Sequence, residues 1–318
     1  MRILVTGGSG YVGWHLIQEL LQLKYEVISY DFIKKIDLTP EKNLLSLPGV
    51  SDDLSELHSL DRNLLIDAVI HLAAKKSVLE SAANPTAFWK TNVDGSKNVA
   101  RFVSERKIPI LINASSAAVY GHNTNNIIDS TTAVNPKSVY GETKAIAEHE
   151  MRKNLSTDET NFYNLRFFNI AGQSSSYKVD TPDVNIFPQV ANALRTDKSF
   201  KLNGDDFSTR DGTCIRDFIH VQDVVQAITS CLQDQNISKA FFQRSINICS
   251  GVGTSMLEVI RLMEDQAGRS LKIQVLPRRD EDPKEVIGDP SIFFQLIDNR
   301  ALHSIGEIAS STWHSHLS

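Results

Sequence analysis

Cysteine is scarce in this chain, and the patterns typical of disulfide-rich or metal-binding proteins are missing. Only three of the 318 residues are cysteines, Cys214, Cys231 and Cys249. They are too few for a disulfide framework, and their spacing matches no zinc site. The nine histidines include no His-Glu-x-x-His pair, so we expect no metal centre.

The sequence also has neither a strong charge excess nor a long apolar run. Its formal net charge of −5 disfavours nucleic acid and an anionic membrane surface as main partners. No apolar run approaches the roughly 20 residues that span a bilayer. The first expected strand begins at Arg2, which leaves no room for a signal peptide. We therefore expect a cytoplasmic protein with neither nucleic acid nor membrane as its partner.

The N-terminal stretch predicts a dinucleotide-binding turn. The apolar run Ile3–Thr6 is typical of a buried parallel strand, and an amphipathic stretch from Trp14 to Leu23 follows. Between them Gly7, Gly10 and Gly13 would let the backbone turn tightly and approach a pyrophosphate at the helix N-terminus. A glycine-rich turn without a ligand is the alternative, but its position directly after the first strand favours phosphate binding.

An acidic residue ends the second expected strand, Glu26–Tyr30. This residue, Asp31, lies 18 positions beyond Gly13. At this spacing a carboxylate accepts hydrogen bonds from an adenosine ribose and repels a 2′-phosphate. The sequence therefore favours NAD over NADP as cofactor, although Lys34 and Lys35 lie nearby.

The signal is poor from Phe32 to Asp67, a segment that we interpret as loop-like. Asp53 and Leu54 are the candidates there for the stretch that passes the adenine.

Alternating strand and helix patterns continue to about residue 172 and predict a parallel, doubly wound α/β sheet. Further strands are expected at 67–74, 109–113 and 160–169, and helices at 85–107 and around Tyr140. His71, inside the strand at 67–74, is expected to be a satisfied core histidine. Lys76 and Val78 follow that strand at its carboxyl end, where open α/β sheets bind ligands.

After residue 172 the pattern loosens, and a smaller α/β unit is expected. A polar loop at 173–183 precedes helices near 187–195, 222–232 and 255–267 and strands at 245–249 and 271–276.

Tyr140 and Lys144 lie four positions apart on an expected helix and so share one face. A phenol with a pKa near ~10 costs roughly 4 kcal/mol to ionise at neutral pH. A cation about 6 Å away offsets about 3 kcal/mol at an effective dielectric of ~20, and an oxidised nicotinamide would supply the rest. Tyr140 could then remove a proton from a sugar hydroxyl at pH 7. Ser116, at an expected strand end 24 residues earlier, is a better candidate for hydrogen-bonding the substrate than for capping.

Five ordered motifs together resemble the extended short-chain dehydrogenase/reductase family, and within it the nucleotide-sugar 4-epimerases. The motifs lie at 4–13, 115–121, 138–144, 166–169 and 211–221, so the resemblance covers nearly the whole chain. It implies a Rossmann-type sheet with a smaller C-terminal α/β substrate-binding domain. The expected boundaries are 1–172 for the NAD-binding domain and 173–318 mainly for nucleotide-sugar binding, with the chain crossing between them near 220–250.

The resemblance implies that NAD stays bound while UDP-glucose and UDP-galactose, or their N-acetylated forms, are interconverted. Tyr140 would take the proton of the 4′-hydroxyl while the C4 hydride moves to nicotinamide. The 4-keto sugar would then turn over, and the hydride would return to its other face. Lys144 would lower the pKa of the phenol and hold the nicotinamide ribose, and Ser116 would hydrogen-bond the reacting oxygen.

The same resemblance assigns binding residues and an assembly. The NAD site would be lined by Gly7, Gly10, Tyr11, Val12, Gly13, Asp31, Asp53, Leu54, Leu72, Ala73, Ala74, Lys76, Asn92, Tyr140, Lys144 and Phe168. The nucleotide sugar would be held by Val78, Ser116, Asn169, Asn185, Ile186, Asn203, Arg216, Arg279 and Asp282. Arg216 and Arg279 would clamp the diphosphate, since a guanidinium binds phosphate oxygens in a bidentate fork. A solvated charged face is the alternative for the cluster at 277–282. Family members pair into dimers through two long helices, here 85–107 and the Tyr140 helix.

Some positions depart from the family pattern and leave other functions open. Asn203 replaces an aromatic residue in the uridine pocket, and Val286 is small where a bulkier residue can crowd the C2 substituent of the sugar. A 4,6-dehydratase would need an acid/base pair where this chain has Ala117 and Ala118. A nucleotide-sugar reductase or dehydrogenase would use the same Ser, Tyr and Lys. A non-catalytic dinucleotide sensor would have no need of the Tyr–Lys pair.

Overall fold

The computed structural model describes residues 1–31, 43–49, 51–122, 127–155, 159–174, 185–234, 242–279 and 282–317. The chain forms two compact units, each built from three separate segments. The first unit comprises Met1–Gly121, Ala133–Arg166 and Val225–Ile246, and the second comprises His122–Thr132, Phe167–Val224 and Asn247–Ser318. Within the described residues, no helix has both the length and the apolar character needed to cross a bilayer.

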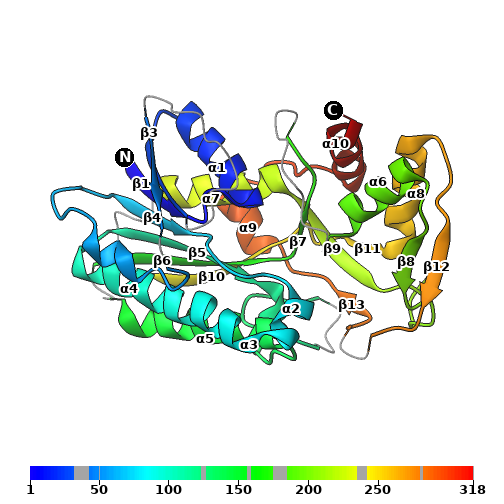
Figure 1. Cartoon of the computed structure of the whole chain (residues 1–318), viewed down its shortest axis with the longest axis horizontal. Coiled ribbons are helices and arrows are strands. Elements are labelled where there is room, and N and C mark those ends of the chain that lie inside the picture. Colours follow the sequence, from blue (N-terminus) through cyan, green and yellow to red (C-terminus); the bar gives the residue numbers. More distant parts are fainter. Residues whose placement is uncertain are drawn as a thin grey trace. The chain divides into compact units, whose positions relative to one another are not determined.

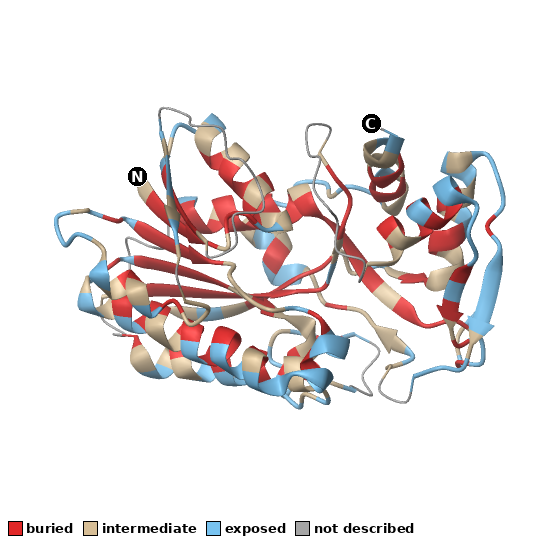
Figure 2. Ribbon diagram, viewed as in Figure 1, coloured by how far each residue is buried: buried red, intermediate tan, exposed pale blue. Residues whose placement is uncertain are grey.

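The first unit contains a seven-stranded sheet in the order β10-β6-β5-β4-β1-β2-β3 (Figure 1). Every pair from β3 through β5 is parallel. Most of its central strands are buried on both faces (Figure 2), as expected for parallel strands covered by helices. This order confirms the predicted doubly wound fold. The strands are β1 (Arg2–Thr6), β2 (Glu26–Asp31), β3 (Leu44–Pro48), β4 (Ala68–His71), β5 (Ile110–Ser116), β6 (Asn161–Phe167) and β10 (Gln243–Ile248).

Helices cover both faces of this sheet. In Figure 1, α4 and α5 lie on one face, while α1 and α7 lie on the other. The predicted helix at 85–107 is a continuous helical run whose middle is a π-helix, η2. The helical elements are α1 (Tyr11–Gln22), η1 (Ser55–Ser59), α2 (Val78–Ala83), α3 (Pro85–Phe88), η2 (Trp89–Asp94), α4 (Gly95–Glu105), η3 (Ala117–Tyr120), α5 (Val139–Asn154) and α7 (Val221–Gln233).

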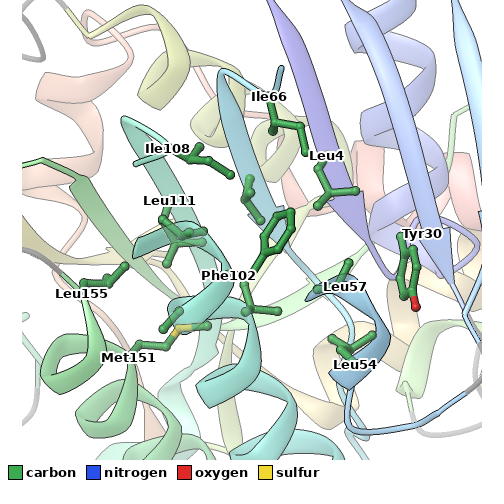
Figure 3. Close-up of a cluster of buried hydrophobic side chains, with 14 of the residues drawn as sticks. Leu4, Tyr30, Leu54, Leu57, Ile66, Phe102, Ile108, Leu111, Met151 and Leu155 are labelled. Carbon is green, nitrogen blue, oxygen red and sulfur yellow. The ribbon is translucent and has the colours of Figure 1, made fainter. Parts of the chain in front are cut away.

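Apolar side chains from the strands and from α4 and α5 form a core that fixes this helix pair (Figure 3). Leu4 and Leu111 of the sheet, Phe102 of α4 and Met151 of α5 are all 1% exposed or less. Each such buried side chain contributes roughly 1.5–3 kcal/mol. This core therefore holds α5, the helix that carries Tyr140, against the sheet.

The second unit is a smaller α/β assembly with its own core. It has a four-stranded sheet of β7, β9, β11 and β13 and a parallel pair, β8 and β12. Its apolar core unites α6, α8 and α10. The elements are β7 (Asn169–Ala171), α6 (Ile186–Thr196), β8 (Phe200–Asn203), β9 (Ile215–His220), β11 (Gly253–Ser255), α8 (Met256–Ala267), β12 (Ile273–Leu276), β13 (Glu285–Val286), α9 (Ser291–Leu296) and α10 (Ile305–Leu317).

Several elements differ from the expectation. The segment 32–67 contains β3 and η1 in its described part rather than only loop, and α2, β8, α9 and α10 were not predicted. The expected strand at 160–169 divides into β6 and β7. Some predicted features lie outside the described residues, namely Lys34, Lys35, most of the loop at 173–183, and residues 280 and 281 of the charge cluster.

Candidate active site

The glycine-rich turn lies between β1 and α1, at the point where the strand order reverses from β1 to β4. Open α/β sheets bind ligands outside the carboxyl ends of their strands at such a point. Gly7 has φ of +75°, and a Cβ on it would lie 2.6 Å from the Ala73 backbone nitrogen. A Cβ on Gly13 would lie 2.2 Å from the Gly7 oxygen. The turn therefore packs directly on the segment after β4 and needs glycine at both positions.

The start of α1 suits an anion. Gly10 is its N-cap, no side chain caps the helix there, and its first turn holds no acidic residue. Tyr11 and Val12 form the beginning of the helix and are partly exposed. Backbone N–H groups at the start of a helix favour a phosphate group. These residues fit the dinucleotide that the sequence predicts.

Asp31 lies at the end of β2, beside the same turn. Its Oδ2 accepts a hydrogen bond from the backbone N–H of Ser9 at 2.9 Å. The turn is also tied to β2 by the Gly7 N–H, which donates to the Tyr30 carbonyl at 3.0 Å. The carboxylate predicted to bind the adenosine ribose is thus joined to the turn predicted to bind the pyrophosphate.

Asp53 and Leu54 are neighbours in the chain but differ in burial. Leu54 is 2% exposed and belongs to the apolar core of the first unit, with φ of +56°. Asp53 Oδ1 accepts hydrogen bonds from Ser51 Oγ at 2.7 Å and from the Ser55 N–H at 3.1 Å, and these lower the pKa of its carboxyl. Only the polar residue of the pair therefore has its side chain near the surface.

The strand end after β4 runs beside the glycine turn. The Leu72 N–H donates to the Thr6 carbonyl at 3.0 Å, and Ala73 is the residue on which Gly7 packs. Ala74 is partly exposed and Lys76 is exposed. His71, one residue before this stretch, is 2% exposed and hydrogen-bonded to Thr6 and Ser96. Burial lowers the pKa of His71 to about 3, so it is a neutral core histidine, as expected.

Asn92 lies on the π-helix η2 and is 1% exposed. Its amide donates to the Lys75 carbonyl at 3.0 Å and to Thr143 Oγ1 at 3.0 Å, and its Oδ1 accepts from the Lys75 N–H at 2.8 Å. Together these bonds join η2 to the strand end after β4 and to α5. Asn92 therefore fixes the geometry of the site, a role that the sequence did not indicate.

Tyr140 is in the first turn of α5, whose N-cap is Ser138. Its backbone N–H donates to Ser81 Oγ of α2 at 3.1 Å. Its phenol is hydrogen-bonded to Ser116 at the end of β5. Val78, 42% exposed, begins the same short α2. The predicted catalytic Ser and Tyr thus lie in contact.

The electrostatics of the pair differ from the expectation in one respect. Burial raises the pKa of the Tyr140 phenol above its usual 10, and the hydrogen bond from Ser116 opposes this shift. The Lys144 ammonium donates to the Ala114 carbonyl at 2.8 Å, and burial lowers its pKa to about 8. The protein by itself does not make the phenol acidic, because desolvation outweighs the hydrogen bond from Ser116.

A buried charged network next to Lys144 was missed by the sequence reasoning. Glu148, 2% exposed, accepts two hydrogen bonds from Arg166, at 3.1 and 2.8 Å. Arg166 of β6 also donates to the Tyr120 hydroxyl at 2.9 Å. The available signal was the position of Glu148, four residues beyond Lys144 on the same face, and a charged residue within a buried strand.

In the second unit, three predicted substrate residues lie together. Arg216 on β9 donates through Nη1 to the Pro283 carbonyl at 2.8 Å, and its Nη2 lies 3.8 Å from Asp282 Oδ1. The Asp282 N–H donates to the Arg279 carbonyl at 3.1 Å, and Arg279 is exposed. The structure therefore brings the Arg216 guanidinium close to the Asp282 carboxylate and joins Asp282 to the backbone of Arg279.

The other predicted binding residues of the second unit lie at β7, at the start of α6 and at the end of β8. Asn185 N-caps α6, which begins with Ile186, and its amide donates to the Ile170 carbonyl at 2.6 Å. Asn169 is an exposed residue of β7, and Phe168 beside it is 6% exposed. Asn203 ends β8 and pairs with Leu276 of β12. Among the residues that the structure describes, Asn203 forms no hydrogen bond with Asn169 or Asn185.

The chain matches a family of known proteins and is similar to individual members. A family model described as the NAD dependent epimerase/dehydratase family matches residues 3–249. The chain is similar to a UDP-glucose 4-epimerase of Lactobacillus helveticus, with 29% identity over 328 residues that cover 100% of this chain and 98% of the relative.

Two solved structures of 4-epimerases are also similar to this chain. A UDP-glucose-4-epimerase from Stenotrophomonas maltophila with bound NAD and formylated UDP-arabinopyranose is similar with a TM-score of 0.91 and 29% identity, covering 100% of this chain and 98% of the other. A UDP-Glc/GlcNAc 4-epimerase from Campylobacter jejuni has a TM-score of 0.84 and 29% identity, and the match covers 99% of each chain.

Proposed function

Since the chain belongs to the NAD-dependent epimerase/dehydratase family, we propose that it is a nucleotide-sugar 4-epimerase that interconverts UDP-glucose and UDP-galactose. The observation that carries this proposal is the contact of Ser116 with Tyr140, one helical turn from Lys144, in the same unit as a glycine turn and Asp31 that fit NAD. NAD, when bound, supplies an acceptor for the C4 hydride of the sugar and returns that hydride.

The residues of the chain divide the remaining work. Tyr140 takes and returns the proton of the 4′-hydroxyl, which Ser116 orients through its hydrogen bond. Lys144, still mostly protonated at neutral pH because its pKa is about 8, supplies positive charge for the phenolate. We propose that Arg216 and Arg279 bind the nucleotide diphosphate. The rest of the predicted nucleotide-sugar set is Val78, Asn169, Asn185, Ile186, Asn203 and Asp282, while Phe168 belongs to the predicted NAD site.

An assay with and without added cofactor tests the proposal. Purified protein would be incubated with UDP-glucose, with and without NADH, and the sugars and cofactor would be quantified. Formation of UDP-galactose without net cofactor consumption supports the epimerase. Stoichiometric turnover of added cofactor would instead identify a reductase or dehydrogenase. A dehydratase is disfavoured by the methyl groups of Ala117 and Ala118 in η3, which can neither donate nor accept a proton.

The C2 substituent is tested in the same assay with UDP-N-acetylglucosamine. Val286 on β13 pairs with Arg216 on β9, so it lies beside a residue that we assign to the diphosphate. Its small side chain leaves room for an N-acetyl group. The similar Campylobacter jejuni enzyme is described as acting on both UDP-Glc and GlcNAc forms, and we propose that this chain accepts both.

Replacing Asp31 by asparagine should relax the preference for NAD. The amide keeps an acceptor for the Ser9 N–H but removes the negative charge that repels a 2′-phosphate, so NADP binding should tighten about tenfold relative to NAD. Dissociation constants of both cofactors, measured by calorimetry, check this. Asp67→Asn, whose carboxylate instead accepts from the Arg2 N–H, serves as the control. An unchanged ratio of the two constants would remove Asp31 from cofactor selection.

We also propose a cytoplasmic homodimer. The three cysteines of the chain are free and buried, as is usual in a reducing compartment. The expected pairing helices expose two large apolar side chains, Trp89 at 37% and Ile146 at 40%. Light scattering of the purified protein should give the mass of two chains, and Ile146→Glu should shift it towards one. A monomeric wild-type protein would refute the pairing.

A further inference from the structure

The carboxyl end of β5 is joined to α5 by three successive contacts. Tyr140, Lys144 and Glu148 are spaced by four residues, so their side chains share one face of α5. They meet three consecutive residues of β5. The contacts are the hydrogen bond between Tyr140 and Ser116, that from Lys144 Nζ to the Ala114 carbonyl at 2.8 Å, and that from Ser115 Oγ to Glu148 Oε1 at 2.5 Å. Glu148 is the one member of this row to which the proposed chemistry gives no role.

Glu148 is held as a fixed negative charge. It is 2% exposed, and the Arg166 fork binds both of its carboxylate oxygens. Hydrogen bonds and ion pairing of this kind favour the ionised carboxylate over the neutral acid, and the pKa of Glu148 is lowered despite its burial. Arg166 is itself 5% exposed and packs over the Tyr120 ring, 4.9 Å from its centroid. Both charges are thus buried and hydrogen-bonded to each other.

Lys144 is the group that this charge faces. It is 7% exposed, and desolvation lowers its pKa, while the charge of Glu148 raises it. The other titratable groups around it do not replace Glu148. His71 on β4 is neutral, since its pKa is about 3, and the Tyr140 phenol is neutral as well. Arg166 on β6 is positively charged, and a positive charge lowers the pKa of Lys144 where Glu148 raises it.

From this arrangement we propose that Glu148, fixed by Arg166 and Ser115, is a positioning residue that orients the end of β5 against α5 and keeps Lys144 charged for the reaction. This inference rests on the proposed function, because the charge of Lys144 matters only where Tyr140 acts as an acid and base. Glu148 itself acts through Lys144 and Ser115.

The test is a direct titration of Lys144 in the NAD-containing enzyme. Protein labelled with 13C at the lysine Cε positions would be followed by NMR from pH 6 to 11, with the Lys144 signal assigned from Lys144→Met. In Glu148→Gln the amide keeps the volume and one acceptor but loses the charge, so the pKa of Lys144 should fall by about one unit or more. Because the ammonium is the active form, the alkaline limb of turnover should move to lower pH by the same amount.

The Arg166→Gln variant tests the fixing of Glu148. It removes the guanidinium that keeps the buried carboxylate ionised, so the pKa of Lys144 should fall, as it does in Glu148→Gln. Arg152→Gln is the matched control, because Arg152 lies 3.6 Å from Glu148 but is 34% exposed, and solvent screens such charges. It should change the titration by less than about half a unit.

The outcomes decide the proposal in every case. A folded Glu148→Gln protein with an unchanged Lys144 titration overturns it. If Glu148→Gln does not fold, Arg166→Gln decides, and a rise or no change in the Lys144 pKa overturns it. The NMR measurement does not depend on sugar turnover. A wild-type protein that fails to epimerise would therefore refute the proposed function, while the titration would still test the effect of Glu148 on Lys144.

Discussion

Replacing Tyr140 by phenylalanine lowers epimerisation by about 10²–10⁴-fold, the usual contribution of a general base, while NAD stays bound. The ring keeps its place, because the contact of the Tyr140 backbone N–H with Ser81 does not involve the hydroxyl. Only the group that is hydrogen-bonded to Ser116 is lost. Initial rates with UDP-glucose and the amount of NAD released on denaturation measure the two effects.

Tyr25→Phe is the matched control, since it removes a hydroxyl from a residue directly before β2 that we assign to no site. It should leave both measurements unchanged. If Tyr140→Phe turned over at the wild-type rate, another group would have to be the base and the proposed mechanism would be abandoned. If it lost NAD together with activity, the phenol would instead be a cofactor contact.

Replacing Gly13 by alanine should yield a protein that purifies without NAD and is less stable by about 1–3 kcal/mol, the usual cost of overpacking. The added methyl would lie 2.2 Å from the Gly7 oxygen and 2.8 Å from the Gly8 Cα. Both are backbone atoms, so the turn itself must move to relieve the contact. The N–H groups at the start of α1 then no longer face the turn in the same way.

Urea unfolding and the absorbance of released nucleotide measure these two losses. Gly306→Ala in α10 is the control, since its added methyl would lie 3.8 Å from Ser304 Oγ, which is an ordinary van der Waals contact. That variant should keep its NAD and its stability. Retention of NAD by Gly13→Ala would show that the turn tolerates a methyl and would weaken its assignment as the phosphate site.

The parts of the fold that the sequence predicts are those with a strong local signal. The central strands are buried on both faces and read as apolar runs, and β1, β2 and β5 lie where those runs indicate. By contrast β3 is an edge strand with mostly exposed or half-buried residues and ends at Pro48. An edge strand needs no continuous apolar run, which explains why the segment 32–67 read as loop.

For the candidate site, spacing along one helix was enough to place Tyr140 with Lys144, and order along the chain placed Ser116 beside them. What could not be read from the sequence is the contact between distant elements. Asn92 bonds to Lys75 and to Thr143, 51 residues further on, and Glu148 bonds to Arg166 of another strand. The pKa of Tyr140 likewise depends on burial, which a spacing argument does not contain.

The route of the chain has a consequence for how the enzyme is made. The first unit takes its last segment from Val225–Ile246, and that segment supplies most of β10, the neighbour of β6 in the sheet. A nascent chain must therefore leave the ribosome to about residue 246 before this sheet can close. Until then β6 presents an unpaired edge, a known template for aggregation, so a gene fragment ending at 172 should give insoluble product rather than a separate half-enzyme.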